Sequence, residues 1–339
     1  MTAYWRVPAG LHTASLRLPV EGQLADLDGA TGWLNSPPLT PAGLRGKVVL
    51  VNFWTYTCIN WLRQLPYVRA WAARYSGQGL VVLGVHTPEF PFEHNADNVG
   101  PSVQEMEIDY PVAIDNNYAV WRAFDNHYWP ALYFADGQGR IRHHHYGEGE
   151  YGQSEMVIQQ LLAEAGSAGA GDDLVFVESR GAEAPADWDT LRSPENYTGY
   201  ERTENLASPG GAVPGTPHVY TAPAELSLNH WALSGAWTVE EQAATLNQAG
   251  GQIAYRFHAR DLHLVMGSAA PGTPIRFRAL IDGQPPGAAH GADTDEAGHG
   301  TVTQPRLYQL IRQSGLIADH TFEITFLDSG AQAYAFTFG

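Results

Sequence analysis

Apolar and polar positions change their spacing twice along the chain. From residue 46 to about 166, short apolar runs alternate with segments of helical periodicity. The apolar runs predict strands over 48–54, 80–85, 111–114, 131–134 and 140–146. The segments between and after them predict helices over 59–75, 94–107, 118–124 and 155–164. Strands that alternate with helices, with a hairpin signal at Asp136-Gly137-Gln138-Gly139 before the last helix, indicate an α/β domain over 46–166.

Beyond residue 172 the hydrophobic period becomes two. Apolar side chains alternate with polar neighbours at 253–257, 262–266, 275–281 and 322–326. Turn residues such as Asp282-Gly283 separate these runs. This pattern predicts an antiparallel β-sandwich, roughly of jelly-roll type, over 172–339. The small residues of 167–171 predict a linker between the two domains, and 1–45 reads as an irregular lead-in to the first.

Composition narrows the class of protein. The 339 residues are enough for about two domains, and the net charge of -17 argues against a nucleic-acid surface or an anionic membrane as partner. The start of the chain, Met1–Pro8, lacks an apolar core of signal-peptide length, and no later run reaches the ~20 apolar residues of a membrane span. We therefore expect a soluble, cytoplasmic protein.

Cys58 is the only cysteine of the chain, and it stands between a predicted strand and a predicted helix. The first turn of a helix presents N–H groups without partners and a partial positive charge, which together favour a thiolate over a thiol. A cysteine at this position is therefore a candidate nucleophile. The alternative is a small buried side chain that is no longer reactive.

The first domain resembles the TlpA/DipZ-like (redoxin) branch of the thioredoxin superfamily. The resemblance rests on Leu44–Trp54 as the strand before the active site, on Cys58 as its first cysteine and on Pro66 as the proline inside the active-site helix. Trp129-Pro130 resembles the cis-proline loop of the family, which packs beside the active-site cysteine and positions the substrate. Two closing strands, Leu307–Arg312 and Ala333–Gly339, carry a second and weaker resemblance. With them the second domain resembles the β-sandwich, similar to a carbohydrate-binding module, that follows the redoxin domain in DipZ-like proteins.

The sequence departs from that family where the second cysteine of the Cys-x-x-Cys pair belongs, because Trp61 stands there. A second thiol must resolve the mixed disulfide that forms during thiol–disulfide exchange. Without one, the ordinary dithiol cycle fails. A monothiol cycle remains, in which Cys58 attacks a peroxide or a disulfide and an external thiol releases it.

Several residues are candidates to line the site. Thr55 lies three residues before Cys58, a spacing that resembles the Thr-x-x-Cys of peroxiredoxins, although Val51 replaces their proline. An aromatic rim of Tyr56, Trp61 and Trp129 is a second hypothesis, with Trp61 as a mere filler of volume its alternative. The remaining candidates are Thr57 next to Cys58, Glu89 after the second strand as an aid to proton transfer, and His127 before the Pro130 loop.

Two further groups have a less specific pattern. His143, His144 and His145 suggest a metal site, but alternate strand residues point to opposite faces and no further ligand is spaced to join them, so a surface strand is expected and no metal. In the second domain, Trp231, Trp237, His230 and Asp282 are candidates for a sugar-binding face. That hypothesis depends on fold analogy.

The sequence therefore predicts a single-cysteine redoxin, an oxidoreductase or antioxidant without metal or organic cofactor. Cys58 is its expected nucleophile, and its expected partners are an external thiol reductant and a peroxide, low-molecular-weight disulfide or protein substrate. The alternative is a non-catalytic thioredoxin-fold scaffold whose β-sandwich binds carbohydrate or a partner.

Overall fold

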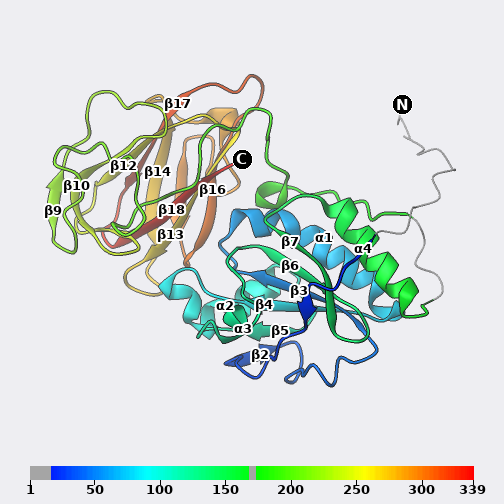
Figure 1. The fold of residues 1–339 in the computed structure, drawn as a ribbon. Helices are drawn as coiled ribbons and strands as arrows, with labels where there is room; N and C mark the ends of the chain where they lie inside the picture. The colour runs from blue at the N-terminus through cyan, green and yellow to red at the C-terminus, as the bar shows by residue number, and fades with distance from the viewer. Residues whose placement is uncertain (1–16, 168–172) are drawn as a thin grey trace. The chain divides into compact units, whose positions relative to one another are not determined.

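The structure is a computed structural model that describes residues 17–167 and 173–339. The predicted linker at 167–171 lies almost wholly outside the described residues. The chain forms two compact units (Figure 1). The first unit comprises the described parts of Met1–Thr55, Gln64–Glu89 and Gly100–Val177, and the second comprises Tyr56–Arg63, Phe90–Val99 and Glu178–Gly339.

A seven-stranded mixed sheet forms the centre of the first unit, in the order β1-β7-β6-β3-β4-β5-β2. Its strands are β1 (Gly22–Gln23), β2 (Gly32–Leu34), β3 (Val48–Trp54), β4 (Leu80–His86), β5 (Val112–Ile114), β6 (Ala131–Ala135) and β7 (Arg140–Tyr146). The strand β3 is central, pairs parallel with β4 and antiparallel with β6, and is buried along its whole length. A continuous apolar run fits this place because both faces of β3 are covered.

In the part of the chain that the structure describes, four α-helices accompany this sheet: α1 (Ile59–Tyr75), α2 (Ala96–Glu105), α3 (Ala119–Ala123) and α4 (Tyr151–Glu164). Two short 3-10 helices, η1 (Ser76–Gln78) and η2 (Pro91–His94), lie beside β4 in the chain. The predicted thioredoxin-like order of strands and helices is confirmed. One prediction is wrong, because the lead-in before residue 46 is not wholly irregular: β1 and β2 pair with the edge strands β7 and β5 through backbone hydrogen bonds. Such short pairings depend little on side-chain pattern, which is why the sequence did not reveal them.

The second unit contains an all-β sheet of eleven strands within the described residues. They are β8 (Asn196–Tyr197), β9 (His218–Tyr220), β10 (Trp231–Val239), β11 (Ala244–Leu246), β12 (Gln252–Phe257), β13 (Asp261–Ser268), β14 (Ile275–Ile281), β15 (His299–Val302), β16 (Arg306–Arg312), β17 (His320–Phe326) and β18 (Ala331–Phe338). Two further 3-10 helices are η3 (Gly181–Glu183) and η4 (Gly287–Ala289). The first half of β10 pairs with β12 and its second half with β11, so one strand joins the two halves of the curled sheet.

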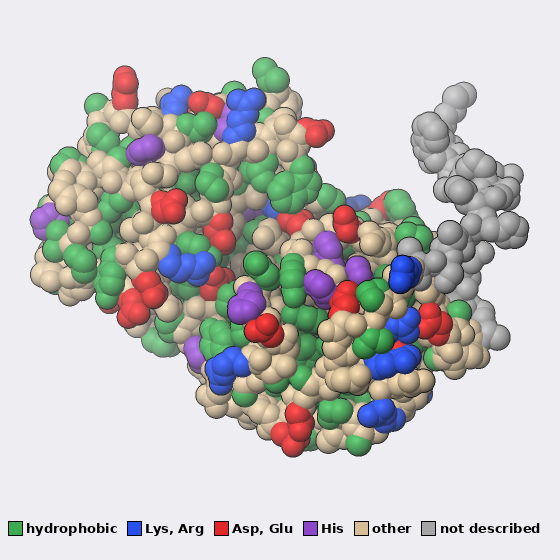
Figure 2. All heavy atoms as spheres, in the orientation of Figure 1, with side chains coloured by type: hydrophobic (Ala, Val, Ile, Leu, Met, Phe, Trp, Pro, Cys, Tyr) green, Lys and Arg blue, Asp and Glu red, His purple; other side chains and the backbone are tan. Residues whose placement is uncertain are grey.

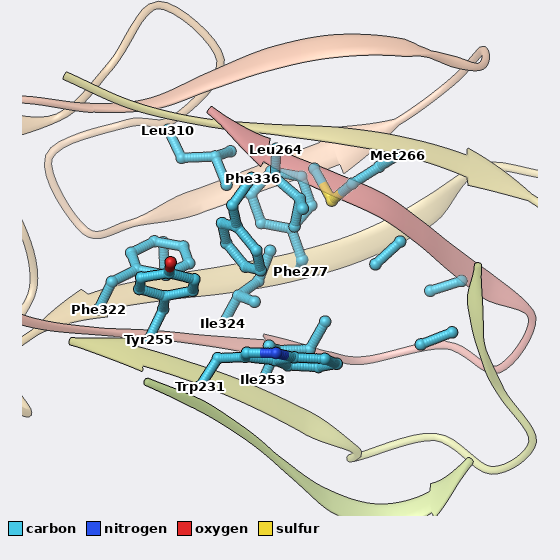
Figure 3. Packing of buried hydrophobic residues seen from close by; sticks show 14 of the residues in the cluster. Trp231, Ile253, Tyr255, Leu264, Met266, Phe277, Leu310, Phe322, Ile324 and Phe336 are labelled. Carbon is cyan, nitrogen blue, oxygen red and sulfur yellow. The ribbon is translucent and has the colours of Figure 1, made fainter. Parts of the chain in front are cut away.

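Aromatic and aliphatic side chains from both halves of this sheet meet in one core (Figure 3). Tyr255 on β12 has its ring centroid 4.9 Å from that of Phe336 on β18. The predicted alternation is confirmed on β12 and β17, whose inward side chains are buried and whose outward ones are partly exposed. On β13 it is wrong, because seven successive residues from Asp261 are buried. The strand lies between β16 and β18, and both of its faces are covered.

The surface of the chain agrees with its acidic composition. Acidic and basic side chains are interspersed over the face seen in Figure 2. Among the described residues, no helix combines the length and apolar character that a membrane span requires.

Candidate functional site

Cys58 lies at the N-terminus of α1, between the end of β3 and the first helical turn. Its carbonyl oxygen accepts a hydrogen bond from the Leu62 amide at 3.0 Å, which is the first intrahelical bond and makes Cys58 the N-cap residue. The side chain is partly exposed. With 17 residues, α1 is long enough for its dipole to place a partial positive charge beside the thiol. The thiol thus lies at a helix N-terminus with partial access to solvent.

A neutral amide pair lies at the centre of the sheet, on the elements that hold Cys58. Asn52 on β3 is fully buried and donates through Nδ2 to Oε1 of Gln64 on α1 at 2.9 Å. Gln64 in turn donates through Nε2 to the carbonyl oxygen of Gly147 at 3.3 Å. Hydrogen-bonded amides carry no charge here, so this pair ties α1 to the sheet rather than accepting a proton.

The loop before β6 carries the second predicted feature of the site. The Trp129–Pro130 peptide bond is cis, and Pro130 is buried. The Trp129 indole is half-buried and donates through Nε1 to the carbonyl oxygen of Thr87 at 3.0 Å. The loop is therefore fastened to the segment that follows β4.

The connection between β4 and α2 also binds Thr57, the residue before Cys58, through a hydrogen bond. Glu93 in η2 is fully buried, and its Oε1 accepts a hydrogen bond from the Thr57 hydroxyl at 2.6 Å. Its Oε2 accepts from the Phe90 amide at 2.9 Å. Burial, and after it the charge of Glu93, raises the pKa of the neighbouring Tyr56 phenol well above its ordinary value. Glu93 was not among the candidates from the sequence. An acidic residue directly after the apolar run Phe90-Pro91-Phe92 is nevertheless a signal of a buried carboxylate.

The structure corrects the hypothesis of an aromatic rim. Trp61 and Tyr56 are 0% and 1% exposed, so neither offers a face to solvent, and only Trp129 is partly accessible. Trp61 fills volume inside the protein, which was the alternative for this residue. Thr55 is fully buried as well, and its hydroxyl has no hydrogen-bond partner among the described residues.

Two polar candidates lie closer to the surface. Glu89 is half-buried at the end of the segment after β4. His127 is exposed, and its Nε2 lies 3.3 Å from a carboxylate oxygen of the equally exposed Asp125. An exposed pair of this kind is a surface interaction rather than part of a protected catalytic site.

The three consecutive histidines lie on β7, as the surface-strand prediction requires. His144 contacts Glu21 at 2.7 Å, whereas His145 lies 3.8 Å from Glu150. Histidine side chains gather over this strand in Figure 2. Across residues 17–167 and 173–339 no group of three or more metal-ligating side chains is present.

The structure excludes both candidate tryptophans from the predicted sugar-binding face. Trp231 and Trp237 are both 0% exposed and belong to the sandwich core, so neither ring can stack on a sugar (Figure 3 labels Trp231). Aromatic side chains on strands more often belong to the hydrophobic core than to a ligand-binding surface, and both tryptophans follow that rule. His230 and Asp282 stay partly exposed, and Asp282 pairs with His320 at 2.7 Å.

A second buried carboxylate, Asp115, was also not foreseen. Its oxygens accept hydrogen bonds from the Val120 amide at 3.0 Å and the Trp121 amide at 2.8 Å, at the start of α3. Burial raises the pKa of Asp115, against the hydrogen bonds from these amides that lower it. The carboxylate thus has a structural role as the cap of a short helix.

The fold and the position of Cys58 define the class: a thioredoxin-like α/β domain joined to an all-β domain. Residues 34–144 match the AhpC/TSA family, and residues 193–339 match the family described as thioredoxin like C-terminal domain. The chain is homologous to Protein DipZ of Mycobacterium bovis, with 36% identity over 330 residues and 94% of this chain. It spans 43% of the length of that curated relative.

Shorter matches concern the first half of the chain. Thiol-disulfide oxidoreductase YkuV of Bacillus subtilis is 28% identical over 141 residues, which are 42% of this chain and 95% of YkuV. The solution structure of a thioredoxin-like protein in the oxidised form is 29% identical and covers 43% of this chain and 97% of its own, with a TM-score of 0.40. The family match at 34–144 and the similarities to DipZ and YkuV support a redoxin-like protein.

Proposed function

We propose that this protein is a monothiol redox protein in which Cys58 is the nucleophile. The observation that carries the proposal is the partly exposed Cys58 as N-cap of the long helix α1 in a thioredoxin-like domain. The first-turn amides and the helix dipole favour the thiolate, which is the reactive form. The oxidoreductase name of YkuV agrees with this class of chemistry.

The proposed cycle needs one protein thiol and an external one. With a disulfide, the Cys58 thiolate attacks one sulfur, forms a mixed disulfide and expels the other sulfur as a thiolate. With a peroxide, it attacks one oxygen and becomes a sulfenic acid while the second oxygen leaves as water or an alcohol after protonation. A low-molecular-weight thiol condenses with the sulfenic acid to a mixed disulfide and water. A further thiol then attacks the mixed disulfide, frees Cys58 and leaves as a disulfide.

The loop at Trp129-Pro130 is the proposed substrate-positioning element. Its fixed attachment at Thr87 and its place before β6 support that role, because a rigid loop presents backbone groups to an extended substrate in a constant geometry. The external thiol reductant is a small molecule or a protein thiol in this proposal. No metal or organic cofactor takes part.

Turnover of the Cys58→Ser variant tests the proposal. The two assays are the glutathione-dependent reduction of hydrogen peroxide and that of a low-molecular-weight disulfide such as bis(2-hydroxyethyl) disulfide. We expect turnover in at least one of them and its loss in Cys58→Ser, with circular dichroism as control for the fold. If the variant is as active as the wild type, the monothiol mechanism is wrong and the non-catalytic scaffold becomes the better account.

A further inference from the structure

The residue before Cys58 is held by a carboxylate that has no access to solvent. Glu93 is 0% exposed, Thr57 is 2% exposed, and the hydrogen bond between them is 2.6 Å long. A hydrogen bond to a buried charged group contributes more than one between neutral groups and is costly to break. The Thr57–Glu93 bond is therefore a fixed point of the structure, one residue from the thiol.

Glu93 itself is constrained from its own segment. Its second oxygen accepts the Phe90 amide, three residues earlier, which closes the turn of η2 around the carboxylate. The same connection between β4 and α2 begins at Thr87, whose carbonyl oxygen receives the Trp129 indole. A single connection thus fastens both the residue next to the thiol and the cis-proline loop.

We propose that Glu93 is a positioning residue for Cys58, whose buried carboxylate fixes Thr57 and with it the first turn of α1 from which the thiol reacts. The inference deepens the proposed function, on which it rests. It assigns a role to the hydrogen bond between Glu93 and Thr57, the residue before the reacting thiol. Glu93 acts through Thr57.

The charge of Glu93 adds a second effect at the same place. A buried negative charge disfavours further negative charge nearby, and it already raises the pKa of Tyr56, two residues before Cys58, in addition to burial. In this proposal the positive end of α1 favours the Cys58 thiolate and the Glu93 carboxylate disfavours it. Removal of the Glu93 charge should favour the Cys58 thiolate. Removal of the Thr57 hydroxyl should free the backbone next to Cys58.

Alkylation of Cys58 by iodoacetamide on the intact protein measures both effects without turnover. Because Cys58 is the only cysteine, every label reports on this residue. The variants are Thr57→Val, which keeps the shape and loses the hydroxyl, Thr57→Ser, which keeps the hydroxyl, and Glu93→Gln. Asp97→Asn, at an exposed position four residues after Glu93, is the matched control for loss of one negative charge.

We expect Thr57→Val to lower the limiting rate constant at high pH about fivefold or more, and Thr57→Ser to keep the wild-type value within about twofold. Glu93→Gln should show a similar loss and move the inflection about half a pH unit or more to lower pH, whereas Asp97→Asn moves neither. A role in stability alone would leave the inflection of a folded Glu93→Gln in place.

Three results overturn the inference: equal rates for Thr57→Val and wild type, a Thr57→Ser as slow as Thr57→Val, or a folded Glu93→Gln with unchanged inflection. If Glu93→Gln does not fold, the two Thr57 variants decide. An inactive wild type in the redox assays would instead contradict the proposed function, and the alkylation comparison separates that outcome from this one.

Discussion

Trp61 occupies the position at which the resemblance leads one to expect a second cysteine, and it is buried completely. An indole in that place removes the resolving thiol and fills volume at the first turn of α1. A tryptophan at this position requires a surrounding core that accommodates a much larger side chain than cysteine. Trp61 therefore has a packing role, and the proposed thiol chemistry depends on Cys58 alone.

Truncation of Trp61 tests that structural role. We expect Trp61→Ala to lower the free energy of unfolding by about 3–5 kcal/mol, because a fully buried tryptophan leaves a large cavity. Urea denaturation at neutral pH is the measurement. Trp188→Ala is the control, since Trp188 is 60% exposed and should change stability by less than about 0.5 kcal/mol. Equal losses in the two variants would show that Trp61 is not a packing residue.

At the residue scale, the sequence marks Cys58, Trp129 and Pro130 as candidates because each stands at a position with a recognisable local pattern. Glu93 was missed because its hydrogen-bond partner, Thr57, is 36 residues away in the chain. A pattern of neighbours cannot reveal a hydrogen bond between two loops. The buried state of Trp231 and Trp237 was likewise outside its reach, since tryptophan is compatible with core and surface alike.

At the scale of elements, hydrophobic periodicity gave β3, α1 and β7 with the boundaries that the structure has. It failed on β13, where the alternating polar positions are buried together with the apolar ones. On β13, His263 is 1% exposed, although its place between Leu262 and Leu264 predicted the polar face. The register places β18 and β16 on either side of this strand, a long-range pairing that periodicity does not contain.

The buried His263 makes β13 sensitive to acid. Burial, and after it the positive charge of Arg63, lowers the pKa of His263 to about 3, and Arg312 and Arg260 act in the same direction, whereas the Thr337 carbonyl opposes them. The unfolded chain takes up the proton near the ordinary pKa of about 6.5, whereas the folded chain does not. The free energy of unfolding should therefore fall as the pH falls from about 6.5 towards 3, by up to about 1.4 kcal/mol per unit from this residue.

Denaturation between pH 4 and pH 7 checks this dependence. His263→Gln should have a smaller change in stability over that range than the wild type, and His218→Gln, at an exposed position of β9, should retain the wild-type change. A His263→Gln protein with the full wild-type dependence would assign the acid sensitivity to other groups.

At the scale of the whole molecule, the sequence separated an α/β part from an all-β part, and the structure and the family matches at 34–144 and 193–339 agree with that division. The compact units, however, interleave along the chain, because Tyr56–Arg63 and Phe90–Val99 belong to the second unit. No local pattern predicts such an exchange of segments. Cys58 and Glu93 are thus members of the same unit.

The single cysteine limits the oxidation products of the entire chain. We expect oxidised glutathione to add at most one glutathione per chain, and dithiothreitol to remove it, because no second thiol can displace the glutathione within the molecule. Intact-mass spectrometry counts the additions. Cys58→Ser is the control and should gain none, and a glutathione that leaves spontaneously without an added thiol would contradict the monothiol cycle.

The pH dependence of Cys58 alkylation by iodoacetamide on the folded wild-type protein tests the central claim most directly. The position of Cys58 at the N-terminus of α1 predicts an inflection well below the ~8.5 of an ordinary cysteine thiol. Such a result would establish a stabilised thiolate and the basis of the monothiol cycle. An inflection at or above ~8.5, or no label until the protein unfolds, would contradict the claim and leave the fold as a scaffold without thiol chemistry.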